Sequence, residues 1–144
     1  MSVILVVEDD PGDVFLVRRA FTKDNLKCEL RFARDGEEAV AYIAGEGEFG
    51  DRTRHPLPSL VLLDLKLPRR AGLEVLAWLK SQQNLKGIPV IVLTSSNQAA
   101  DLKSAYELGA NSYLVKPVTT EGLAQMVEAI GVYWLSLNVT PGTP

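Results

Sequence analysis

Residues that could take part in chemistry stand at the ends of four apolar runs. Each group carries a carboxylate, a hydroxyl or an ammonium: Glu8-Asp9-Asp10, Asp64, Thr94-Ser95 and Lys116-Pro117. If the runs are parallel strands, their carboxyl ends meet at one rim of a sheet, which is where such sheets bind ligands. We therefore expect these side chains to form one polar site, although they lie far apart in the sequence.

The residue types favour phosphoryl transfer that depends on a divalent cation. Clustered carboxylates repel one another unless a cation lies between them, and hard oxygen ligands with room for water suit Mg²⁺. The cation would keep Asp64 ionised and nucleophilic, and it would neutralise charge on an incoming phosphoryl group. Lys116 and the hydroxyl of Thr94 could each contact a phosphoryl oxygen. Because no base stands out that could activate water, an acyl phosphate on Asp64 should persist long enough to serve as a signal.

Five short apolar runs supply the strands that would position this rim. They are Val3–Val7, Cys28–Ala33, Leu60–Leu65, Pro89–Thr94 and Ser112–Val115. Four are nearly continuous, as in strands covered on both faces, whereas the second alternates as an edge strand does.

Helical spacing and helix-start residues separate the runs. N-caps are expected at Asp10 before Pro11, Asp35 before Glu38, Ser96 or Asn97, and Thr119 or Thr120. A further helix is marked by Leu73, Leu76 and Leu79, and the helix opened by Ser96 or Asn97 should stop at Gly109. The alternation predicts an α/β fold, a doubly wound parallel sheet with helices on both faces.

The composition is that of one ordinary globular domain. Of 144 residues, 47% are apolar and 23% are charged, and the formal net charge is −3. Since no Lys and Arg cluster interrupts this balance, we expect no nucleic-acid partner. One cysteine, Cys28, and one histidine exclude an internal disulfide and a zinc-ligand set. With no leader and no apolar run long enough to cross a bilayer, a cytoplasmic protein without membrane contact is expected.

Four motifs together resemble the signature of the response-regulator receiver family, of the kind found in chemotaxis regulators. They are Val6-Val7-Glu8-Asp9-Asp10, Leu62-Leu63-Asp64-Leu65-Lys66-Leu67-Pro68 with Gly72, Leu93-Thr94-Ser95, and Gly109 to Pro117. The resemblance covers about residues 3–130. It implies a five-stranded flavodoxin-like sheet of order 2-1-3-4-5 with five helices. It also implies a receiver domain at residues 1–131, followed by an extension of the last helix and a tail at 132–144.

The resemblance also implies a role for each metal-site residue. Asp64 is the phosphoacceptor, and Asp9 and Asp64 bind Mg²⁺ directly. Glu8 acts through a bound water, and the backbone carbonyl of Lys66 supplies a further ligand. One departure stands out, because many family members carry a smaller polar residue at the position of Lys66.

The resemblance also implies a switch pair, Thr94 and Tyr113, and a phosphoryl contact from Lys116. The hydroxyl of Thr94 moves to the phosphoryl group, and the ring of Tyr113 then swings inward. Lys116 contacts the phosphoryl group, and its bond to Pro117 is cis. From the residues alone, Tyr113 could equally be an edge-strand aromatic.

The resulting function is that of a single-domain response regulator, which accepts a phosphoryl group from a sensor histidine kinase. It is a signalling protein and not an enzyme, apart from its own Mg²⁺-dependent phosphorylation and dephosphorylation.

A phosphatase that forms an aspartyl phosphate would be expected to carry a second Asp where Lys66 stands. A flavodoxin-like cofactor carrier would not need this polar rim, and a receiver cut from a transcriptional regulator would require an effector domain. Gly45 to Gly50 fits G-x-G-x-x-G, but it follows a helix rather than a strand, which argues against dinucleotide binding.

Two features are similar to the small regulators paired with bacterial phytochromes, the light-sensing histidine kinases. They are the long loop Gly45–Ser59, expected as a surface insertion, and the aromatic extension Val132–Leu137. The alternative is a generic receiver with a long loop. The stripe Leu123, Val127, Ile130 and Trp134 continues into Tyr133, Leu135 and Leu137. Such an exposed Trp-Leu cluster favours a homodimer through the last helix, with the neighbouring fourth helix and fifth strand. The alternative is that the extension folds back over its own domain.

Overall fold

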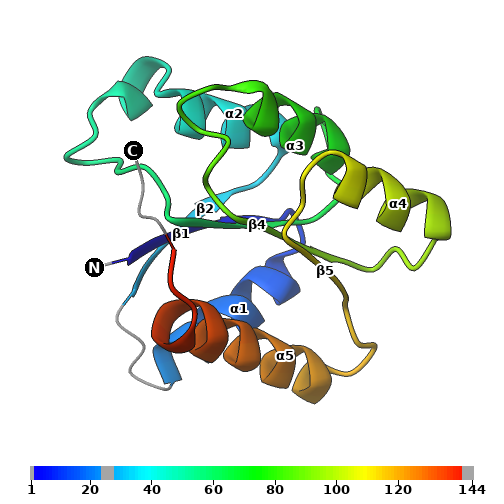
Figure 1. Cartoon of the computed structure of the whole chain (residues 1–144). Coiled ribbons are helices and arrows are strands. Elements are labelled where there is room, and N and C mark those ends of the chain that lie inside the picture. The colour runs from blue at the N-terminus through cyan, green and yellow to red at the C-terminus, as the bar shows by residue number, and fades with distance from the viewer. Residues whose placement is uncertain (1, 24–27, 141–144) are drawn as a thin grey trace.

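The computed structural model describes residues 2–23 and 28–140, in which strands and α-helices alternate (Figure 1). The strands are β1 (Ser2–Val7), β2 (Cys28–Ala33), β3 (Leu60–Leu63), β4 (Val90–Thr94) and β5 (Ser112–Val115). The helices are α1 (Pro11–Lys23), α2 (Gly36–Ala44), α3 (Gly72–Ser81), α4 (Ala99–Glu107) and α5 (Thr120–Val132). A 3₁₀ turn lies at Gly47–Gly50, and one π-helical turn follows α5 at Tyr133–Leu137.

The five strands form one parallel sheet in the order β2-β1-β3-β4-β5. This confirms the predicted doubly wound α/β fold with five helices. The alternating run is the edge strand β2, which is only half-buried over most of its length, whereas β3 and β4 are buried throughout. β3 ends at Leu63, two residues before the predicted end, so Asp64 is the first residue beyond the strand.

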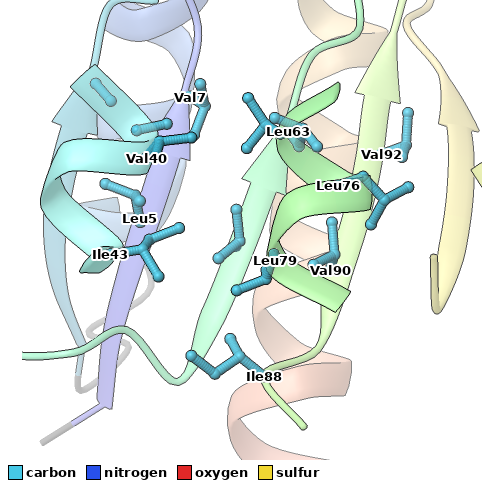
Figure 2. Close-up of a cluster of buried hydrophobic side chains, with 14 of the residues drawn as sticks. Leu5, Val7, Val40, Ile43, Leu63, Leu76, Leu79, Ile88, Val90 and Val92 are labelled. Carbon is cyan, nitrogen blue, oxygen red and sulfur yellow. The ribbon is translucent and has the colours of Figure 1, made fainter. Parts of the chain in front are cut away.

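Alternate residues of the central strands pack on opposite faces of the sheet. Leu5, Leu63 and Val92 face α2 and α3, as Figure 2 shows, whereas their neighbours in the strands face α1 and α5. Each buried Leu, Ile or Val side chain contributes about 1.5–3 kcal/mol. A shift of register by one residue would exchange the two faces, so this packing also fixes where every strand ends.

Side-chain caps begin three of the helices as predicted. Asp10 Oδ1 accepts hydrogen bonds from the amides of Gly12 and Asp13 at 2.8 and 3.2 Å. The side chains of Asp35 and Thr119 cap α2 and α5, since each accepts a hydrogen bond from the amide three residues on, that of Glu38 or Gly122. These caps hold the helices at the ends of the strands that they follow.

The fourth helix begins later than predicted. Its N-cap residue is Gln98 rather than Ser96 or Asn97. Ser96 is buried, and its hydroxyl donates a 2.5 Å hydrogen bond to Asp101 Oδ2. The other end agrees with the prediction, since Gly109 has a φ of 107°.

The long insertion before β3 is packed against the domain. The guanidinium of Arg52 donates to the carbonyl oxygen of Tyr42, near the end of α2, at 2.8 Å. The rings of Tyr42, Phe49 and His55 lie with centroids 5.1–6.0 Å apart. Gly45, the first glycine of the G-x-G-x-x-G pattern, is the left-handed C-cap of α2. The pattern therefore ends a helix instead of opening one.

The aromatic extension lies largely against its own domain. Trp134 and Leu135 pack beside the core between the sheet and α1 and α5, whereas Tyr133 and Leu137 are exposed. The expectation of an exposed Trp-Leu cluster was therefore wrong for Trp134, because its ring packs against the cluster that includes the buried residues Val127 and Ile130 of α5. Residues 141–144 of the expected tail lie outside the described residues. Within the described ranges, no helix is long and apolar enough to cross a membrane.

Candidate functional site

Backbone hydrogen bonds between neighbouring strands fix the positions of Asp64 and Lys116 at the carboxyl end of the sheet. The amide of Asp64 donates to the carbonyl oxygen of Val7 at 3.1 Å. The amide of Lys116 donates to the carbonyl oxygen of Thr94 at 2.8 Å. Both bonds continue the parallel ladder by one step past the strands. The side chains of Asp64 and Lys116 therefore start from rigid positions.

Gly72 allows α3 to begin against the backbone of Asp64. Its amide donates to the carbonyl oxygen of Leu65 at 2.9 Å. A Cβ atom at this position would lie 2.2 Å from the carbonyl oxygen of Asp64 and 2.6 Å from Cα of Leu65. Because these are backbone atoms, no side chain larger than that of glycine fits there without moving the rim.

Three carboxylates gather at the rim. Glu8, Asp9 and Asp64 each offer an oxygen within 4.8 Å of the others. Glu8 and Asp64 are buried, at 5% and 6% exposed, and Asp9 is exposed. Glu8 Oε2 accepts hydrogen bonds from the amides of Asp9 and Asp10, both at 3.1 Å. The backbone after β1 therefore holds the Glu8 carboxylate in place.

The ammonium of Lys116 joins three carboxylates that come from separate parts of the chain. Its Nζ lies 2.5 Å from Glu8 Oε1, 2.8 Å from Asp13 Oδ2 and 3.0 Å from Asp64 Oδ2. Its side chain is 10% exposed. Charge-assisted hydrogen bonds shielded from water in this way are stronger than those at the surface.

The negative charge of the cluster exceeds what Lys116 neutralises. Burial raises the pKa of Glu8 to about 7, the hydrogen bond from Lys116 opposes that rise, and the charge of Asp64 adds to it. For Lys116, burial acts to lower the pKa. The hydrogen bonds to Asp13 and Glu8 and the charges of Asp64 and Glu8 outweigh burial, so the pKa of Lys116 is raised above its usual value. Lys116 is therefore a permanent cation beside a carboxyl group that can still gain a proton.

The donor set fits a hard divalent cation. Glu8, Asp9 and Asp64 present carboxylate oxygens on one side of an open cleft, with room for water ligands. Lys66 lines the same cleft, and its amide donates to Asp64 Oδ1 at 3.3 Å. Burial is the main reason that the pKa of Glu8 is raised, and a bound cation would oppose this effect by favouring the ionised carboxylate.

The two expected switch residues are joined through Ser96. Thr94 is fully buried, and its Oγ1 accepts a hydrogen bond from the amide of Ser96 at 3.3 Å. The hydroxyl of Tyr113 donates to the carbonyl oxygen of Ser96 at 2.9 Å, and the half-buried ring packs beside the core. The loop between β4 and α4 therefore connects the end of β4 to β5.

Comparison with known proteins gives the family. The family model described as the response regulator receiver domain matches residues 4–128. The chain is 43% identical to the probable methanogenesis regulatory protein FilR2 of Methanothrix harundinacea, over 97% of this chain and 88% of the relative. It is 41% identical to the response regulator Rcp1 of Synechocystis, over 97% of this chain and 93% of the relative. The chain belongs to the response-regulator receiver family.

Solved receivers have the same architecture over nearly the whole chain. The Mn²⁺-bound form of Rcp1 superposes with a TM-score of 0.92 at 40% identity, covering 99% of this chain and 100% of that one. The phosphorylated cyanobacterial phytochrome response regulator RcpA superposes with a TM-score of 0.93 at 39% identity, covering 98% and 99%. The expected similarity to phytochrome-associated regulators is confirmed.

This receiver differs from the sequence-based expectations at one peptide bond. No cis peptide bond occurs within residues 2–23 and 28–140, so the bond between Lys116 and Pro117 is trans. The expectation of a cis bond was wrong, because proline makes the cis form accessible without making it the favoured form.

The sequence did not predict the part that Asp13 takes in the cleft. Asp13 lines the cleft and hydrogen-bonds Lys116, whereas Ser95, which was expected at the rim beside Thr94, lines the cleft as predicted. Asp13 had a usable signal, since it lies three residues after the cap Asp10 and so on the first turn of the helix. Its pairing with a lysine from the far end of the chain could not be read from that spacing.

Proposed function

We propose that this receiver accepts a phosphoryl group on Asp64 from a sensor histidine kinase and works as a single-domain response regulator in the cytoplasm. The observation that carries the proposal is the 3.0 Å contact between Lys116 Nζ and Asp64 Oδ2 inside the carboxylate cluster. A buried carboxylate that is held by its backbone and paired with a fixed cation is suited to nucleophilic attack on phosphorus.

The chain's own residues then have separate tasks in the transfer. A bond forms between a carboxylate oxygen of Asp64 and phosphorus while the nitrogen–phosphorus bond of the kinase phosphohistidine breaks, and the electron pair stays on the imidazole. Lys116 offsets charge on the phosphoryl oxygens. Asp9 and Asp64 would hold Mg²⁺ directly, with Glu8 acting through water and Lys66 through its carbonyl oxygen. When bound, Mg²⁺ supplies positive charge to the carboxylates and to the transferring group.

The output is proposed to pass through Thr94 and Tyr113. The amide of Ser96 donates a 3.3 Å hydrogen bond to the hydroxyl of Thr94. This bond would break if the hydroxyl moved toward the phosphoryl group. Because Ser96 also binds the Tyr113 hydroxyl, the loop and the ring would shift together. Such a signal changes the populations of existing conformations of α4, β5 and α5.

A bacterial phytochrome is the proposed phosphoryl donor. The proposal is supported by the similarity to RcpA, which is a phytochrome response regulator, and to Rcp1. The similarity to FilR2, which is named for methanogenesis, favours the alternative of a receiver paired with another histidine kinase. Phosphotransfer from each histidine kinase of the source organism decides between them, because the cognate kinase labels its receiver fastest.

We also propose a homodimer formed by α4, β5 and the end of α5. Apolar side chains are exposed at Leu102 and Tyr106 on α4, at Val115 on β5, and at Tyr133 and Leu137 in the π-helical turn that follows α5. Tyrosines that offer a large surface with a polar tip are typical interface anchors. We further propose the division into a receiver domain at residues 1–131 and an extension at 132–144 that contributes to this contact.

The phosphoacceptor is tested by incubation with acetyl phosphate and Mg²⁺, followed by intact mass and peptide mapping. We expect one phosphoryl group, located on Asp64, and none in Asp64→Asn. Asp51→Asn is the matched control, since Asp51 lies in the insertion and outside the cleft. Undiminished labelling of Asp64→Asn would contradict the assignment.

A further inference from the structure

Asp13 takes part in the cleft without belonging to the carboxylates that could hold a metal ion. It lies in the first turn of α1, and its Oδ2 is 2.8 Å from Nζ of Lys116. The oxygens gathered within 4.8 Å are those of Glu8, Asp9 and Asp64. Asp13 is therefore a partner of the lysine and stands apart from the metal group.

The three donor hydrogens of the Lys116 ammonium match its three carboxylate partners. Two of these partners, Glu8 and Asp64, also belong to the group that could hold a divalent cation. A divalent cation attracts both carboxylates and repels the ammonium. Asp13 is the one partner of the three that remains fully available to Lys116 when the cation binds.

The fold leaves the carboxylate of Asp13 free for this contact. Asp10 caps α1, and its Oδ1 accepts from the amides of Gly12 and Asp13. The side chain of Asp13 is 23% exposed and that of Lys116 is 10% exposed, so the pair is largely shielded from water. Most of the energy of such a pair depends on this shielding from water.

On the basis of the phosphoacceptor role of Asp64, we propose that Asp13 is a positioning residue that holds the Lys116 ammonium in the cleft when cation and phosphoryl group engage Glu8 and Asp64. Asp13 acts through Lys116 and does not touch the reacting atoms. Without Asp13, the lysine must compete with the cation for the same carboxylates.

The first test is a double-mutant cycle on Mn²⁺ affinity, measured from the free-ion signal in electron paramagnetic resonance. Asp13→Asn should weaken binding by about fivefold, a coupling in the range found for contacting charged residues. In a Lys116→Met background the same substitution should have only the effect of a lost charge on the rim. An equal loss in both backgrounds would overturn the proposal.

Asp10→Asn gives the matched control for charge. It removes the same charge from the same cleft, and Asn caps a helix as well as Asp does. We expect a smaller loss of Mn²⁺ affinity than for Asp13→Asn in the wild-type background. If the two variants lose the same affinity, Asp13 contributes only its charge and the proposal fails.

The second test observes Lys116 itself. With saturating Mg²⁺, the side-chain ¹⁵N–H signal of Lys116 should stay protected from exchange with water in the wild type. It should be lost in Asp13→Asn and return in Asp13→Glu. A protected signal in Asp13→Asn would show that another group holds the lysine, and the proposal would be wrong. Labelling by acetyl phosphate is measured separately. If the wild type holds Lys116 through Asp13 but accepts no phosphoryl group, the proposed function is contradicted and the role of Asp13 is not.

Discussion

The hydroxyl of Tyr113 donates a 2.9 Å hydrogen bond to the carbonyl oxygen of Ser96, across the gap between β5 and the loop that follows β4. The ring is half-buried beside the core, and the amide of Ser96 donates to the hydroxyl of Thr94 at 3.3 Å. The loop of Ser96 is thereby tied to both residues that are proposed to switch.

Removing this bond should loosen the loop. Tyr113→Phe keeps the ring but leaves the Ser96 carbonyl oxygen without its donor, at an expected cost of about 1 kcal/mol in the free energy of unfolding. Amide exchange between Ser96 and α4 should speed up at the same time. Urea unfolding and hydrogen exchange measure the two effects. Tyr106→Phe, at an exposed tyrosine on α4, is the control, and an equal effect of both variants would contradict the proposed role of the bond.

A methyl group at position 72 should disturb the phosphoacceptor. In Gly72→Ala the new Cβ would meet the carbonyl oxygen of Asp64 at 2.2 Å, so the backbone must move. We expect a loss of about 1–3 kcal/mol in stability and slower labelling of Asp64. Gly87→Ala is the matched control, because a Cβ there meets nothing within 4 Å. If Gly72→Ala labels and unfolds as Gly87→Ala does, the close approach does not constrain the site.

Glu8 should make the metal-free protein less stable as the pH rises from about 4.5 to about 7. The folded protein keeps the Glu8 proton up to a pKa of about 7, whereas the unfolded chain loses it near the ordinary value of 4.5. The folded state therefore binds more protons in this interval, and stability falls by an amount on the order of 2 kcal/mol. Saturating Mg²⁺ should reduce this fall, because it favours the ionised carboxylate.

The readout for Glu8 is the slope of unfolding free energy against pH in a chelating buffer. Glu8→Gln should flatten the slope between pH 4.5 and 7, whatever its absolute stability. Glu107→Gln, at an exposed side chain on α4, should leave the slope unchanged. A slope in Glu8→Gln equal to that of the wild type would assign the titration to another group.

Local patterns were sufficient to predict most of the fold and the centre of the site. Continuous apolar runs identified strands buried on both faces, and the positions just after them identified Glu8, Asp64 and Lys116. What the sequence did not show depends on contacts between distant segments. Ser96 was expected to cap a helix, but Asp101, Thr94 and Tyr113 engage it instead. Helical spacing likewise placed Trp134 on one stripe with Val127 and Ile130, but it did not show that the domain covers this stripe as far as Trp134.

The proposed homodimer can be tested with substitutions that leave the core of the domain intact. Trp134 packs on its own domain, so its removal would weaken the fold as well as any interface. Leu102 and Tyr106 are exposed on α4 and suit the test better. Leu102→Ser combined with Tyr106→Ser should raise the dimer dissociation constant by at least about tenfold, since exposed anchors of this kind contribute 1 kcal/mol or more each.

Sedimentation velocity over a range of concentrations measures that constant, with and without acetyl phosphate and Mg²⁺. Phe15→Ser serves as the control, because Phe15 is an apolar side chain on α1 that is even more exposed than Leu102 and Tyr106 and lies outside the proposed interface. A dimer weakened equally by Phe15→Ser would place the contact elsewhere. A wild type that stays monomeric at high micromolar concentration in both conditions would rule the dimer out. If phosphorylation strengthens the dimer, the hydrogen bond between Tyr113 and Ser96 would offer a physical connection between the two sites, since the loop that holds Ser96 leads directly into α4, where the interface is proposed.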